Sequence, residues 1–316
     1  MSKLGIVFTG QGSQFVGMGK DLYDTFESVR EIFDRAGKAL DIDLVSLCFE
    51  GPREILDLTV NTQVTVLTLE IAIYELYRRH IGIRPSVMAG HSLGEYSALY
   101  AAQAADLPDM VRLVYARARH FQNAVPAGTG AMAGILGLEN GDVEKICKEA
   151  GGNREVVEIS GFNAPGQVVI SGHNGAVERA MIKAKEKRAG AVRLPISAPC
   201  HCSLMKRAAD DFLDDLNRVD FQEIRIPVIP NCNPFVYYTR KNARDLLLAQ
   251  LTSPVRWSEA IERMAAMGVS TILEIGPKAI LTGLIKRIDK SIRLQHIGNV
   301  DSLNKAKDYF ENFTRR

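Results

Sequence analysis

The chain lacks a long apolar run and has almost no net charge. Its longest apolar candidate, residues 64–77, is interrupted by Glu70 and Glu75, whereas a membrane-spanning helix needs about 20 predominantly apolar residues. The 316 residues include 39 Lys and Arg against 37 Asp and Glu, a net charge of +2, and a dedicated polyanion binder is more basic. The composition therefore predicts neither a membrane protein nor a nucleic-acid-binding protein.

Cysteine is scarce, and its positions are scattered. The five cysteines are Cys48, Cys147, Cys200, Cys202 and Cys232. An odd, dispersed set fits reduced thiols better than a disulfide framework, and the N-terminus lacks the apolar core and cleavage site of a signal peptide. Cys200-His201-Cys202 could be read as a zinc site, but its spacing is too short and a second ligand pair is missing. We therefore expect a cytoplasmic protein without a metal.

Apolar segments alternate with helical patterns along most of the chain. Strands are predicted at residues 4–9, 86–89 and 271–275, and helices at residues 21–40, 63–79 and 108–124. Strands separated by helices predict a parallel sheet covered on both faces, with functional residues at the carboxyl ends of its strands. The order indicates a large α/β domain that resembles the hydrolase type.

A smaller unit interrupts this pattern between residues 128 and 195. Its strands are expected at residues 131–136, 156–160, 167–171 and 191–196, and its helices at 140–150 and 175–188. The order β-α-β-β-α-β is that of a ferredoxin-like domain. The sequence thus predicts a large α/β domain from residues 1–127 and 196–316, with a small ferredoxin-like domain at 128–195 inserted into it.

The pentapeptide Gly90-His91-Ser92-Leu93-Gly94 follows a predicted strand and precedes a helical segment. In this context the G-x-S-x-G pattern is a nucleophile elbow, which presents Ser92 at the top of a sheet. The backbone N–H of Leu93 then points toward a helix N-terminus, where developing negative charge is favoured. The motif predicts acyl transfer through a seryl ester, although a tight turn without chemistry could share the pattern.

A serine nucleophile needs a base, and the chain has six histidines. We expect His91 to project away from Ser92. His201 lies in a non-helical turn where the chain leaves the inserted unit, and clefts between domains are common ligand sites. His201 is therefore the candidate base. An esterase or thioesterase with Asp289 and His296 as its acid and base is the alternative, because the order Ser, acid, His occurs in α/β-hydrolases.

Two further residues could complete such a site. Arg117 falls on the apolar stripe of the helix at 108–124, and a buried guanidinium requires a partner. That partner is either an internal carboxylate or a substrate carboxylate, which arginine can bind with two hydrogen bonds; alternatively, the side chain extends along the apolar surface to solvent. Gln11, between Gly10 and Gly12, lacks the context of a phosphate-binding loop. Its backbone N–H could instead be the second oxyanion donor.

These residues match a known family. The shared segments are Gly10-Gln11-Gly12-Ser13-Gln14, Gly90-His91-Ser92-Leu93-Gly94-Glu95-Tyr96, Tyr115-Ala116-Arg117, Gly130-Ala131-Met132-Ala133, Asn163-Ala164-Pro165-Gly166-Gln167, Pro199-Cys200-His201-Cys202, Gln250 before Ser253-Pro254-Val255-Arg256-Trp257, and Glu274-Ile275-Gly276-Pro277. In these segments, and in their order along nearly the whole chain, the sequence resembles malonyl-CoA:acyl carrier protein transacylases of type II fatty acid synthesis.

The resemblance implies a ping-pong transfer of malonyl from coenzyme A to acyl carrier protein, with the thioester as substrate and no cofactor. It implies that Ser92 is the nucleophile, that His201 is the base and that the main-chain carbonyl of Gln250 orients this histidine. It further implies that Gln11 and Leu93 form the oxyanion hole and that Arg117 binds the malonyl carboxylate. A non-catalytic coenzyme A or carrier-binding module remains a second alternative, which the intact set of residues disfavours.

Two matters stay open at this level. The residue before the histidine is often Ser in the bacterial enzymes and Phe in malonyl-selective polyketide domains, whereas this chain has Cys200; its small side chain leaves the exclusion of methylmalonyl in question. The acidic carrier protein needs a basic docking surface. The candidates, which could also be solvated helix faces, are Lys183, Lys185, Lys187 and Arg188 in one run and Lys286, Arg287 and Lys290 in another.

Overall fold

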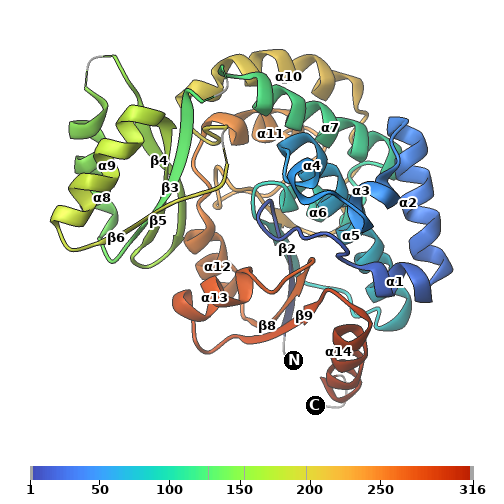
Figure 1. Ribbon diagram of the computed structural model, residues 1–316. Helices are drawn as coiled ribbons and strands as arrows, with labels where there is room; N and C mark the ends of the chain where they lie inside the picture. The colour runs from blue at the N-terminus through green and yellow to red at the C-terminus, as the bar shows by residue number, and fades with distance from the viewer. Residues whose placement is uncertain (1–2, 127, 153, 197, 314–316) are drawn as a thin grey trace.

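The chain forms two sheets that lie side by side, each with its own helices (Figure 1). The computed structural model describes residues 3–126, 128–152, 154–196 and 198–313. The larger sheet has the order β7-β2-β1-β8-β9, and every neighbouring pair is parallel. Its strands are β1 (Lys3–Phe8), β2 (Val87–Gly90), β7 (Val228–Ile229), β8 (Val269–Ile275) and β9 (Arg293–Ile297). The predicted parallel α/β architecture is confirmed.

The helices of the larger unit precede, connect and follow these strands. They are α1 (Lys20–Thr25), α2 (Glu27–Leu40), α3 (Leu44–Phe49), α4 (Arg53–Leu56), α5 (Thr59–His80), α6 (Gly94–Ala101), α7 (Leu107–Asn123), α10 (Lys206–Arg218), α11 (Ala243–Thr252), α12 (Trp257–Ala266), α13 (Leu281–Ile288) and α14 (Val300–Phe313), with a 3-10 turn at Ser203–Met205 before α10. Among the described residues, no helix is both long and apolar enough to cross a membrane.

The smaller sheet is antiparallel throughout, with the order β4-β5-β3-β6. Its elements follow one another as β3 (Gly130–Leu136), α8 (Asn140–Gly151), β4 (Val157–Ala164), β5 (Gln167–His173), α9 (Asn174–Glu186) and β6 (Gly190–Arg193). This is the predicted β-α-β-β-α-β order, and Figure 1 shows both helices on the outer face of the sheet. The domain limits at 127/128 and 195/196 stay a prediction.

Several local boundaries differ from the predictions. The single helix expected at residues 21–40 is two helices, because Phe26 adopts an extended conformation between α1 and α2. The last small strand ends at Arg193 rather than 196, and β4 continues to Ala164. Periodicity alone locates such limits poorly, because one extended residue interrupts a helix without changing its apolar stripe.

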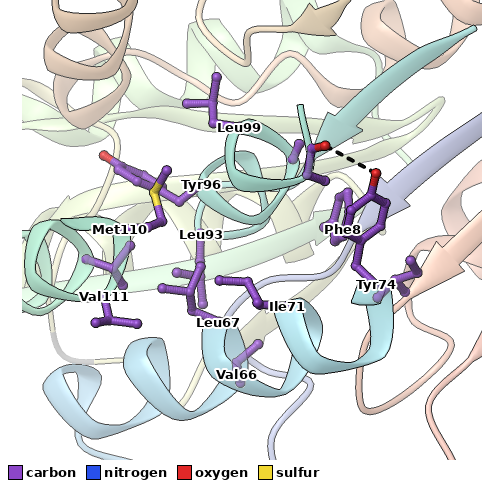
Figure 2. Close-up of a cluster of buried hydrophobic side chains, with 14 of the residues drawn as sticks. Phe8, Val66, Leu67, Ile71, Tyr74, Leu93, Tyr96, Leu99, Met110 and Val111 are labelled. Atoms are coloured by element: carbon purple, nitrogen blue, oxygen red, sulfur yellow. Dashed lines mark hydrogen bonds between the residues drawn. The ribbon is translucent and has the colours of Figure 1, made fainter. Parts of the chain in front are cut away.

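Helix α5 is buried along most of its length and packs against α6. Figure 2 shows Leu67 and Ile71 of α5 packed toward Leu93, at the start of α6, with Met110 of α7 close by. On the far side, the ring of Phe8 lies edge-on to Tyr74, with 6.0 Å between the ring centroids. Close packing of this kind resists small displacements, so the end of β1 and the start of α6 share one rigid support.

Candidate active site

Ser92 occupies a sharp turn between β2 and α6, where its φ is 53°. Such a left-handed conformation is costly for a residue with a side chain and is common at functional sites. A Cβ at Gly94 would lie 2.1 Å from the carbonyl oxygen of Thr9, and one at Gly90 would lie 1.9 Å from the carbonyl carbon of Gly94. Glycine at these two positions is therefore required for α6 to begin this close to the ends of β1 and β2. The local sequence therefore folds as the predicted elbow.

The hydroxyl of Ser92 meets the imidazole of His201. Their Oγ and Nε2 atoms are 2.7 Å apart, and the Nδ1 of His201 lies 2.8 Å from the main-chain oxygen of Gln250. Because a carbonyl only accepts, Nδ1 carries the proton and Nε2 can accept the hydrogen of the serine hydroxyl. Such an arrangement can serve as a nucleophile, a base and a group that orients the base.

His201 is held as a neutral imidazole. Burial, and secondly the charge of Arg117, lower its pKa to about 3. Its side chain also rests edge-on against Phe121, with 5.9 Å between ring centroids. A neutral histidine at physiological pH can take a proton at once, without first losing one.

Arg117 is completely buried in α7, as its place on the apolar stripe predicts. Its Nη1 donates to Gln63 Oε1 at 2.7 Å, and its Nη2 donates to Gln250 Oε1 at 2.9 Å and to Ser92 Oγ at 3.0 Å. Among the described residues, no carboxylate forms an ion pair with this guanidinium, and its Nε has no hydrogen-bond partner. The hydrogen-bond partners of this positive charge are thus neutral groups, one of them the hydroxyl of Ser92.

Two aromatic rings complete the surroundings of this charge. The guanidinium carbon lies 4.4 Å from the ring centroid of Phe121 and 5.1 Å from that of Tyr96. Rings at this distance attract a cation, by about 0.5–2 kcal/mol each. Together with the amide oxygens they offset part of the cost of burying the charge.

Gln11 lies on the loop that follows β1, beside the elbow. A Cβ at Gly10 would lie 2.5 Å from the main-chain oxygen of His91, so the two loops are in direct contact. Within the described part of the chain, the backbone N–H groups of Gln11 and Leu93 have no hydrogen-bond partner. Two unsatisfied donors beside a serine are the arrangement that an oxyanion requires.

Gln11, Ser92 and His201 line a cleft of about 330 Å³ between the two sheets. Its walls come from both units and include Gln11, Ser92, His201 and Cys200 on one side and Met132, Asn163 and Gln167 on the other. Cys200 is buried, and this burial raises the pKa of its thiol to about 12. The thiol therefore acts as a small apolar side chain on the cleft wall rather than as a nucleophile.

Within the part of the chain that the structure describes, His296 and Asp289 form no hydrogen bond with Ser92. His296 Nε2 lies 2.8 Å from the main-chain oxygen of Gly276, and Asp289 hydrogen-bonds to Ser291. The base that Ser92 contacts is His201. The side chain of His91 turns to Asn163 instead of Ser92, with Nε2 3.0 Å from Asn163 Oδ1, and it borders the cleft.

The sequence reasoning missed four buried residues around the site: Gln63, Glu95, Asn231 and Tyr238. Asn231 Oδ1 accepts the backbone N–H of Ser92 at 2.7 Å, and Glu95 accepts from Asn231, Gln250 and Tyr238. Burial raises the pKa of Glu95 to about 7. Glu95 could have been predicted, because a charged residue follows the G-x-S-x-G motif directly. Asn231 could not, because it lies on an irregular loop without a sequence pattern.

A family model described as "Acyl transferase domain" matches residues 6–311, so the chain is of the acyl transferase class. A malonyl CoA-acyl carrier protein transacylase of Escherichia coli O157:H7 is 47% identical over 291 residues, 91% of this chain and 93% of that protein. The chain belongs to the malonyl CoA-acyl carrier protein transacylase family.

Solved structures agree with this assignment. The crystal structure of an acyl carrier protein S-malonyltransferase from Vibrio cholerae is similar with a TM-score of 0.93 and 45% identity, over 96% of this chain and 100% of that one. A malonyl-transacylase solved in complex with a type II PKS acyl-carrier protein gives a TM-score of 0.95 and 41% identity, over 98% and 100% of the two chains.

The lowered pKa of His201 predicts that its ring stays neutral across the physiological range. In NMR spectra of histidine-labelled protein, the His201 signals should not titrate between about pH 5 and 8, whereas urea-unfolded chain should titrate near 6.5. Between about pH 6.5 and 3, the unfolded chain binds a proton at His201 and the folded chain does not. The free energy of unfolding should therefore decrease as the pH falls through this range. A titration midpoint near neutrality for His201 would contradict this description of the site.

Proposed function

We propose that this protein transfers malonyl from coenzyme A to the phosphopantetheine thiol of acyl carrier protein, through a malonyl ester on Ser92, and so supplies fatty acid synthesis in the cytoplasm. The observation that carries the proposal is the uncompensated guanidinium of Arg117, 3.0 Å from the serine hydroxyl. An acyl group with a free carboxylate supplies the missing negative charge, and an acetyl group does not.

In the first half-reaction, His201 Nε2 takes the hydroxyl proton of Ser92 as Oγ attacks the thioester carbonyl. The backbone N–H groups of Gln11 and Leu93 stabilise the oxyanion of the tetrahedral intermediate. When the carbon–sulfur bond breaks, His201 returns the proton to the sulfur, and coenzyme A leaves as a thiol. The carbonyl of Gln250 holds the Nδ1–H throughout, so that Nε2 is always the nitrogen that exchanges the proton.

The second half-reaction reverses these roles. The thiol of the carrier's phosphopantetheine loses its proton to His201 and attacks the malonyl ester, and Ser92 leaves with the proton from His201. Arg117 holds the malonyl carboxylate in both halves, which fixes the acyl group while the two thiols exchange. Holding the reacting groups in place accounts for a large part of such a rate enhancement.

The assignment is tested by intact-protein mass spectrometry after mixing with malonyl-CoA. Wild-type protein should gain one malonyl group and lose it when pantetheinylated carrier protein is added. Ser92→Ala should gain nothing, because the nucleophile is missing. Arg117→Met should lose malonylation by about a hundredfold or more, since a hydrogen-bonded charge pair is worth several kcal/mol, and should lose much less with acetyl-CoA.

Steady release of free malonate without a carrier would instead identify a hydrolase. Equal losses for malonyl and acetyl in Arg117→Met would remove Arg117 from the role of carboxylate anchor. Circular dichroism on both variants excludes unfolding as the cause.

We further propose that the carrier docks on the end of α13. Lys286, Arg287 and Lys290 form no ion pair with an acidic side chain in the described residues, and Ile280 and Leu284 of the same segment border the cleft. Figure 1 places α13 beside the small sheet, at the boundary between the two units. An acidic partner on these cations would stand at the entrance through which its phosphopantetheine must pass.

The other basic run is less suited to docking. Lys183 pairs with Glu149 at 2.8 Å, and Lys187 pairs with Asp142 at 3.5 Å, so half of its charges are matched by its own neighbours. Lys183 and Lys187 lie on or just after α9, on the outer side of the small sheet (Figure 1).

Charge reversal separates the two surfaces. The pair Lys286→Glu/Arg287→Glu should raise the KM for carrier protein by roughly tenfold and flatten its salt dependence, with the malonylation rate from malonyl-CoA unchanged within about twofold. The matched control is Lys183→Glu/Lys187→Glu, which should leave the KM for carrier near that of wild type. The opposite pattern would move the docking surface to α9.

A further inference from the structure

Glu95 is the centre of a buried hydrogen-bond network beside the turn that carries Ser92. Its carboxylate accepts from Gln250 Nε2 at 2.5 Å, from the backbone N–H of Asn231 at 3.3 Å and from the hydroxyl of Tyr238. Glu95 and Gln250 are completely buried, and Asn231 and Tyr238 nearly so. Such a cluster is costly unless every polar atom is satisfied, so its geometry is strongly determined.

Gln250 connects this carboxylate to the reacting groups. Its Nε2 also donates to the main-chain oxygen of Ser92 at 2.9 Å, while its Oε1 accepts from Arg117 Nη2 at 2.9 Å. A primary amide has one accepting and one donating end. Because the carboxylate of Glu95 and the main-chain oxygen of Ser92 both accept, the donating end must face them, and the accepting end faces Arg117.

Rotating the Gln250 amide by half a turn would break these hydrogen bonds. It would place an amide NH2 against the guanidinium, donor against donor, so that neither group finds an acceptor at this contact. An unsatisfied buried donor costs about 1–3 kcal/mol, and Arg117 would relieve this by moving away from Ser92. The orientation of one amide therefore decides whether the guanidinium points at the nucleophile.

We propose that Glu95 is a positioning residue for acyl-group selectivity, which fixes the Gln250 amide and thereby holds Arg117 where a malonyl carboxylate can bind. This inference rests on the proposed function. Glu95 touches neither Ser92 Oγ nor the guanidinium, so it acts through Gln250 and not as a direct ligand of the substrate.

A purely electrostatic role for Glu95 would have the opposite sign. An anion near Arg117 repels the malonyl carboxylate, so removal of the charge would raise malonyl transfer. Burial raises the pKa of Glu95 to about 7, and the carboxyl group is then only partly ionised at neutral pH. Its oxygens accept the amide hydrogen of Gln250 in either state, which makes orientation the larger contribution.

The experiment compares single-turnover acylation by malonyl-CoA and by acetyl-CoA, read by intact-protein mass spectrometry at one pH. In Glu95→Met, the malonyl-to-acetyl ratio of kcat/KM should fall about tenfold, since 1.4 kcal/mol corresponds to a factor of ten. A general loss of structure would lower the acylation rates with malonyl-CoA and acetyl-CoA alike, and would leave their ratio unchanged. Glu95→Gln should stay within about threefold of wild type, because its carbonyl oxygen can accept from Gln250 while its amide donates to Tyr238.

A double-mutant cycle tests the route through Gln250. Gln250→Met keeps the main-chain carbonyl for His201 and removes only the amide, so it should lower the ratio as Glu95→Met does. The double variant should show no further fall, because both changes break one connection. The control is Glu70→Gln, another completely buried carboxylate, which bonds to Thr9 and Ser97 instead and should leave the ratio unchanged.

An unchanged ratio in Gln250→Met would overturn the inference even if Glu95→Met failed to fold, and so would additive losses in the double variant. A wild-type protein that takes no malonyl from malonyl-CoA would overturn the proposed function itself. Malonylation of the wild type with an unaltered ratio in Glu95→Met would overturn only the role of Glu95.

Discussion

A buried guanidinium that forms no ion pair within the described residues lies next to Ser92, and the rest of the site is arranged around it. Removing a guanidinium from water costs several kcal/mol unless other groups replace the lost solvation. Here two glutamine oxygens, the serine hydroxyl and two aromatic rings replace it. Hydrogen bonds to a charged group are worth about 1.5–3 kcal/mol each, so these neutral partners can hold Arg117 in place without cancelling its charge.

The same interactions tie the charge to the fold. Gln63 comes from α5, which forms the buried base of the larger unit, and its Nε2 also lies 3.4 Å from Gln11 Oε1 on the proposed oxyanion loop. Gln250 comes from α11 and contacts both Ser92 and His201. Each side chain of the site thus has its position set by an element of the scaffold, as preorganised catalysis requires.

The architecture was predictable from the sequence because short apolar runs mark the strands clearly and the 3.6-residue apolar repeat marks the helices. The β-α-β-β-α-β order of the small unit and the parallel strands β1, β2 and β8 follow from short apolar runs between helical patterns. The elbow was predictable because only glycine fits at Gly90 and Gly94. Arg117 was predictable because a charge stood on an apolar stripe. In each case one local physical rule restricted the residue type.

Other features depend on contacts between distant segments, which no local pattern encodes. The two-residue strand β7 exists only because β2 pairs with it, and Asn231 meets Ser92 across 139 positions of sequence. The lowered pKa of His201 likewise arises from burial and from Arg117, which approach only in the folded chain. The network through Glu95 could be named only after its partners were located.

The most direct test of the account is a crystal structure of the enzyme carrying a malonyl ester on Ser92. The account predicts that the malonyl carboxylate points inward, with its oxygens within hydrogen-bond distance of Arg117 Nε and Nη2, while the ester oxygen faces the N–H groups of Gln11 and Leu93. A carboxylate directed toward the mouth of the cleft, with Arg117 still bonded only to Gln63, Gln250 and Ser92, would contradict it.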